Sequence, residues 1–62
     1  MTKFKRSSDG WLVEKEGVAI AHIRHAKPSE VSDWGNVLMI QKNGRIDRHH
    51  SISEAKSDAM KI

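Results

Sequence analysis

The clearest pattern along the chain is an apolar run at residues 37–40, then Asn43-Gly44, then a second extended run at residues 45–50. An Asn-Gly pair between two such runs is the strongest short-range signal for a β-hairpin, because a type I′ turn needs positive φ at both central residues. The predicted cross-strand pairs are Lys42 with Arg45, Gln41 with Ile46, Ile40 with Asp47, Met39 with Arg48 and Leu38 with His49.

A first hairpin is predicted over residues 11–25. The apolar run 11–13 leads into a polar loop with Gly17, and residues 18–25 form the return strand. One face of that strand carries Val18, Ile20, His22 and Arg24. The other carries Ala19, Ala21, Ile23 and His25, since side chains alternate along a strand. The alanines favour a closely packed helix on their side.

The segment after this strand is the least regular. Pro28 ends the strand because it has no amide hydrogen to donate. Residues 29–34 form either one helical turn capped by Ser29 or a loop with Trp34 tucked inward.

A helix is predicted at the C-terminus. Ser51 and Glu54 have the spacing of a capping box, and Ser53 is a competing cap. Helical spacing predicts an inward stripe of Ile52, Ala55, Ala59 and Ile62, with Met60 beside it. The side chains predicted to point away are Lys56, Ser57, Asp58 and Lys61.

These elements predict an α+β fold: a small antiparallel sheet of three to five strands, built from two hairpins, with a C-terminal helix packed on one face. The face opposite the helix is expected to have nothing in this chain to cover it. If the helix covers the face of Leu38 and Ile40, the residues on the open face are Val37, Met39, Ile46, Arg48 and His50.

Length and charge add expectations about domain number, disulfides and the N-terminal segment. The 62 residues are expected to form one small domain, residues 1–62, without cysteines and hence without disulfides. The formal net charge is +3, from 11 Lys or Arg and 8 Asp or Glu. Because Lys3, Lys5 and Arg6 supply this excess, residues 1–8 are either a first edge strand or a flexible basic arm.

No apolar run exceeds the four residues 37–40, so we expect a soluble, cytoplasmic protein without a membrane segment. The four histidines are not expected to bind metal. His22 and His25 are three residues apart and His49 and His50 are adjacent, so on strands each pair points to opposite faces. No carboxylate pair or nucleophile is placed for catalysis, so neither an enzyme nor a cofactor is expected.

The uncovered sheet face is instead predicted to bind a partner. Met and Arg are enriched in interface hot spots, and a small core favours a partner chain or a homodimer. The candidate residues on this face and its rim are Met39, Ile46, Arg48, His50, Arg24 and Trp34. The alternative is an accessory protein that binds nucleic acid through phosphate contacts. Its candidate residues are Lys3, Lys5, Arg6, Lys42, Arg45 and Arg48.

The chain resembles small accessory proteins encoded by phages and prophages. The likeness lies in the Asp-Gly-Trp start at residues 9–11, the Asn-Gly hairpin and the closing helix Ser-Ile-Ser-Glu-Ala-Lys-Ser-Asp-Ala at residues 51–59. It implies a non-enzymatic binding module that occupies a surface on a larger host or viral protein, as inhibitors of host polymerases or defence systems do. The implied location is the cytoplasm of a bacterial host.

Overall fold

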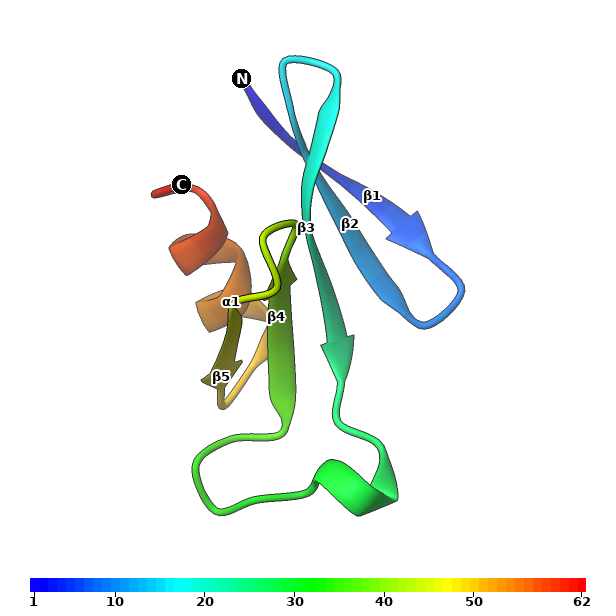
Figure 1. The fold of residues 1–62 in the computed structure, drawn as a ribbon, viewed down its shortest axis with the longest axis vertical. Coiled ribbons are helices and arrows are strands. Elements are labelled where there is room, and N and C mark those ends of the chain that lie inside the picture. The colour runs from blue at the N-terminus through cyan, green and yellow to red at the C-terminus, as the bar shows by residue number, and fades with distance from the viewer.

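The computed structural model describes all of residues 1–62 and shows five antiparallel strands and one α-helix (Figure 1). The sheet order is β1-β2-β3-β4-β5, so each strand pairs with its neighbours in the sequence. The elements are β1 (Thr2–Ser7), β2 (Gly10–Lys15), β3 (Val18–His25), the 3₁₀ turn η1 (Pro28–Glu30), β4 (Val37–Gln41), β5 (Ile46–His49) and α1 (Ile52–Ala59). The predicted α+β class, with a C-terminal helix on the sheet, is confirmed.

Residues 2–7 form an edge strand, not a free arm. Every residue of β1 has a partner in β2, from Thr2 opposite Lys15 to Ser7 opposite Gly10. Gly10 is required there because a Cβ atom would lie 1.9 Å from the carbonyl oxygen of Ile23. Three basic residues on this edge make it a poor template for pairing with another sheet.

The β2–β3 hairpin has the two-residue turn that the sequence had predicted for the other hairpin. Glu16 and Gly17 both have positive φ, 55° and 80°, and Lys15 pairs with Val18 across them. This is the signature of a type I′ turn.

The predicted register of the β4–β5 hairpin is wrong by one residue. Ile40 pairs with Ile46, not with Asp47. The amide of Gly44 donates to Gln41 O at 2.9 Å, and Gly44 alone in this turn has positive φ, 93°. The connection is therefore a three-residue loop with a bulge at Gly44, which also accommodates an Asn-Gly pair.

Helix α1 begins as predicted. The Ser51 hydroxyl accepts a hydrogen bond from the Glu54 amide at 3.1 Å, and Ala55 and Ala59 are completely buried. Two further predictions about α1 are wrong: Met60 and Ile62 are exposed, and Lys56 and Asp58 point toward the sheet. The Lys56 ammonium lies 3.5 Å from the centroid of the Trp11 ring, and Met60 and Ile62 follow the last residue of α1, Ala59.

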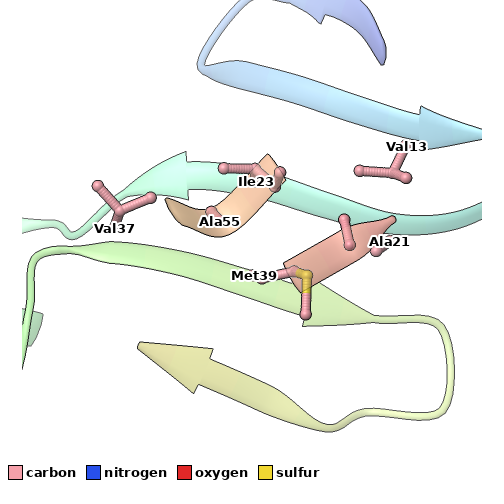
Figure 2. Close-up of a cluster of buried hydrophobic side chains, with 7 residues drawn as sticks. Val13, Ala21, Ile23, Val37, Met39 and Ala55 are labelled. Carbon is pink, nitrogen blue, oxygen red and sulfur yellow. The ribbon is translucent and has the colours of Figure 1, made fainter. Parts of the chain in front are cut away.

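The core lies between α1 and the face of the sheet that carries Met39 (Figure 2). Its buried residues are Val13, Ala21, Ile23, Val37, Met39, Ala55 and Ala59. The helix therefore covers the alanine face of β3, as the small side chains indicated. It does not cover the face of Leu38 and Ile40, so that prediction for β4 is wrong. Ile23 lies opposite Met39, which places Met39 in the core.

Candidate functional site

The face of the sheet opposite α1, here called the open face, has a row of side chains that crosses all five strands. The row consists of Lys5, Leu12, His22, Ile40 and Ile46, each directly opposite the next. Residues paired in this way point to the same side of the sheet. The next row, toward the β3–β4 connection, consists of Ser7, Gly10, Arg24, Leu38 and Arg48.

A hollow of about 360 Å³ lies on the open face and is accessible to solvent. Six of its eight lining residues are hydrophobic, and its lining contains no carboxylate. We call it the apolar groove and define it by Leu12, Val18, Ile20, His22, Ile40 and Lys42. A volume of this size and an apolar lining with few polar groups are typical of binding sites.

A β-bulge underlies the apolar groove. Val13 pairs with Ala21 but Glu14 pairs with Ala19, which leaves Ile20 as an extra residue in β3. A bulge bends its strand and redirects the side chain beside it, and bulges are frequent next to functional sites. The carbonyl of Ile20 is not lost, since it accepts a hydrogen bond from the Lys42 amide at 2.9 Å.

The polar side chains in the lining of the apolar groove are His22 and Lys42, and Lys5 lies opposite Leu12 on the edge strand. His22 Nε2 lies 3.1 Å from Asp9 Oδ1 and 3.2 Å from Ser7 Oγ. Lys5 Nζ lies 3.4 Å from Glu14 Oε1. Lys42 has no partner in an ion pair.

The second row of the open face is covered by the loop of residues 26–36, which contradicts the expectation of a face that nothing in this chain covers. The guanidinium of Arg24 donates two hydrogen bonds to the carboxylate of Glu30, at 2.8 and 3.0 Å. Arg48 Nη1 donates to the carbonyls of Glu30 at 2.9 Å and Gly35 at 3.1 Å. Leu38, between the two arginines, is only 2% exposed.

Charge and hydrogen bonds fix the protonation of this network. The hydrogen bonds from Arg24, and then from the Lys27 amide, lower the pKa of Glu30 from its ordinary value of 4.5 to about 2. The bond to Glu30 in turn raises the pKa of Arg24. The carboxylate is therefore ionised throughout the physiological range, and the loop is held by a permanent ion pair.

The loop is ordered internally and presents two apolar side chains to solvent. The Ser32 amide donates to Asn36 Oδ1 at 2.9 Å, and the Trp34 amide donates to Ser32 Oγ at 3.2 Å. Val31 is 63% and Trp34 80% exposed, so the alternative in which a loop tucks Trp34 inward is wrong, and Trp34 is accessible as the partner-binding candidates require. The helical part of the segment is the 3₁₀ turn Pro28–Glu30, whose N-cap is Lys27 and not the predicted Ser29.

The predicted partner-binding residues are dispersed. Ile46 is 57% exposed on the open face, and His50 is exposed where β5 leads into α1. Arg24 and Arg48 lie on the open face but hold the loop. Met39 is 1% exposed beneath α1 and cannot contact a partner.

The candidates for nucleic-acid contact do not form one surface. Lys5 and Lys42 lie at the apolar groove, whereas Arg6 lies on the other face, 5.1 Å from the Trp11 ring. Lys3 is exposed on the edge strand β1. Arg45 Nε lies 3.4 Å from Asp47 Oδ2, and Arg48 is engaged by the loop. A continuous phosphate track would need these cations on one side of the molecule.

Sequence reasoning missed most of the apolar groove. Leu12, Val18 and Ile20 are absent from the predicted site, because β3 was predicted as a regular alternation without the bulge at Ile20. It also missed Glu30, since nothing local to a Pro-Ser-Glu segment indicates an arginine partner on a neighbouring strand.

The histidines do not take part in a cluster of potential metal ligands. No group of three or more His, Asp or Glu side chains lies close enough together to hold a metal ion. His49 Nε2 faces α1, 3.3 Å from Asp58 Oδ2, and His22 faces Asp9 on the opposite side of the sheet.

Comparison with protein-family models, with curated proteins and with solved structures found no match to this chain. No helix in the structure is long and apolar enough to cross a bilayer.

Proposed function

We propose that this chain is a small, non-enzymatic binding module that docks onto a larger protein through the apolar groove and the adjacent Ile46. The observation that carries the proposal is the groove itself, about 360 Å³ of mostly apolar hollow on a face that α1 leaves uncovered. Apolar surface of this kind, rimmed by polar groups, is characteristic of interaction sites.

The position of the exposed apolar residues supports this proposal. Val18 and Ile46 are 52% and 57% exposed, and Ile46 continues the row that contains Leu12 and Ile40. Each of these side chains would lose contact with water in a complex, which is the main driving force for association. The resemblance to phage accessory proteins is consistent with such a role and indicates a bacterial or viral target.

The test is capture of a binding protein by the immobilised chain from bacterial lysate, with and without nuclease. We expect capture to survive nuclease and to be lost in the double variant Val18→Glu/Ile46→Glu, because charges would then face the partner's apolar surface. Ser57→Glu adds one charge on the exposed side of α1 and is the matched control. Capture that nuclease abolishes, or that the double variant retains, would refute the proposal.

A further inference from the structure

The chemistry of the apolar groove identifies the kind of partner segment that fits it. Resting on the function proposed above, we infer that the groove binds an acidic amphipathic helix, with apolar side chains in the hollow and carboxylates beside Lys42 and Lys5.

The charged groups at the groove favour an acidic ligand. The groove lining contains Lys42 and His22 but no Asp or Glu. The three carboxylates that contact this side of the sheet are already engaged, Asp9 with His22, Glu14 with Lys5 and Glu30 with Arg24. Lys42 has no such partner, and the side chain of Lys5 is 64% exposed despite its contact with Glu14. A ligand with carboxylates therefore meets available cations, whereas a basic ligand meets like charge.

The elements that line the groove are compatible with a helical ligand. The groove is lined from β2 by Leu12, from β3 by residues 18–22, from β4 by Ile40 and from the turn after β4 by Lys42. An amphipathic helix presents a stripe of apolar side chains at every third or fourth residue, which suits a mostly apolar hollow with a cation in its lining. Helix α1 packs against the opposite face of the same sheet, so a second helix would complete a three-layer arrangement.

Charge also distinguishes an acidic helix from a second copy of the chain as the occupant of the groove. A two-fold dimer through the open face would place the same patch against itself. Lys42 would then face the same cationic surface of the other copy, with no carboxylate in either groove to offset it. Charge complementarity thus favours an acidic partner over self-association.

The experiment uses the full chain and two synthetic, fluorescein-labelled helical peptides of about 15 residues, the length at which an isolated helix begins to persist. Both carry the same leucine stripe; one has glutamates on its flanks and the other has lysines. Fluorescence anisotropy measures binding of each peptide. We expect the glutamate peptide to bind at least about tenfold tighter and to weaken as salt is raised, since exposed ion pairs are screened.

Two variants locate the binding site. Lys42→Glu should weaken binding of the glutamate peptide about fivefold, the upper range for one exposed ion pair. Val18→Ser should also weaken it by removing apolar contact. Lys61→Glu makes the same charge change at an exposed residue beyond α1 and should leave the affinity unchanged.

Equal binding of the two peptides, no binding of either, or no effect of Lys42→Glu would overturn the inference. So would self-association in sedimentation that Val18→Glu abolishes, which would identify a second copy as the occupant. If the glutamate peptide fails while capture from lysate still depends on Val18 and Ile46, the assigned partner chemistry is wrong and the proposed function stands. Loss of groove-dependent capture would instead count against the proposed function.

Discussion

Helix α1 covers one face of the sheet with Ala55 and Ala59, whereas the opposite face is covered only in part, by the loop of residues 26–36. On the helix side none of the buried residues is polar or charged, and the charged groups Lys56 and Asp58 contact Trp11 and His49 around this core. On the open face an ion pair between Arg24 and Glu30 holds the loop over Leu38. The apolar groove lies next to this covered region and has no such cover.

The difference shows how a 62-residue chain divides its limited apolar surface. A chain of this size buries only about 60% of the surface that its unfolded form exposes, less than a larger domain does, so one well-packed face supplies most of the stability. The second face can then retain exposed apolar residues such as Val18 and Ile46 without loss of the fold. We therefore expect substitutions on the two faces to have very different effects on the free energy of unfolding.

The largest effect is expected beneath α1. Ala59→Glu places an unpaired charge where the side chain is completely buried, and it should lower the free energy of unfolding by about 3 kcal/mol or more. Urea denaturation followed by circular dichroism measures the change. Ser57→Glu, on the exposed side of the same helix, should change it by less than about 0.5 kcal/mol. Similar losses in both variants would show that α1 does not form the core.

The next largest effect is expected where the loop meets β5. Gly35 has φ of 124°, and a Cβ atom on it would lie 2.4 Å from the carbonyl oxygen of His49. Gly35→Ala should therefore cost about 2 kcal/mol or more, because the strained backbone and the contact must both be relieved.

Gly44→Ala is the matched control for this prediction. Gly44 also has positive φ, 93°, but a Cβ atom there would meet nothing within 4 Å. Its cost should be about 1 kcal/mol, from backbone strain alone. If Gly44→Ala costs as much as Gly35→Ala, close approach of the loop to β5 does not hold it in place.

A smaller effect, and one that depends on pH, is expected from Glu30→Gln. Because the pKa of Glu30 is lowered from 4.5 to about 2 in the folded chain, its contribution to stability is complete above pH 4.5. It should be lost as the pH falls from 4.5 to about 2. Glu30→Gln should not show this loss of stability at acid pH, because the variant has no carboxylate at this position. At pH 7 it should be less stable than the parent.

Urea midpoints between pH 7 and pH 2 test this prediction. Amide exchange at Ala26, whose amide donates to Asn36 O at 2.7 Å, reports whether the loop opens. Glu16→Gln removes an exposed carboxylate in the β2–β3 turn and should not change exchange at Ala26. An unchanged acid profile in Glu30→Gln would show that the ion pair does not hold the loop.

The two hairpin turns show what the sequence could and could not predict. Asn43-Gly44 predicted a hairpin at the right place, but Gly at positive φ suits both a two-residue turn and a three-residue loop with a bulge. The three-residue loop shifts the β4–β5 pairing by one residue relative to a two-residue turn. Such a shift transfers every side chain of one strand to the other face of the sheet. Glu16-Gly17 adopted the type I′ turn although Glu rarely has positive φ.

Two wrong predictions offset each other for Ile46 and Arg48. The predicted register placed Ile46 and Arg48 on the same face of the sheet as Met39. The helix was predicted on the wrong face of β4. Together these errors left Ile46 and Arg48 on the open face, where the structure has them, and left Met39 there wrongly. The alanines of β3 correctly predicted which face of that strand the helix covers. Because Ile23 pairs with Met39, Met39 of β4 lies on the same face of the sheet.

The apolar groove and the loop could not be predicted because both depend on contacts between distant residues. The bulge at Ile20 appears only when β2 and β3 are paired, since both strands read as regular alternations. Arg48 and Glu30 are 18 residues apart and meet through a backbone carbonyl, which any residue supplies. Charge reversal at Arg48 would consequently disturb the loop as well as a partner, so Val18, Lys42 and Ile46 test the open face more cleanly.

The smallest effect on folding is expected at Ile46 and completes the comparison of the two faces. Ile46 is 57% exposed at the edge strand β5, so Ile46→Thr, which keeps a β-branched side chain, should change the free energy of unfolding by less than about 0.5 kcal/mol. Met39→Thr, on the neighbouring strand but 1% exposed beneath α1, should cost about 2 kcal/mol or more through a cavity and a buried hydroxyl. Urea denaturation of both variants measures the difference. A cost at Ile46 comparable to that at Met39 would mean that the open face also supports the fold, and that apolar contact there is not available to a partner.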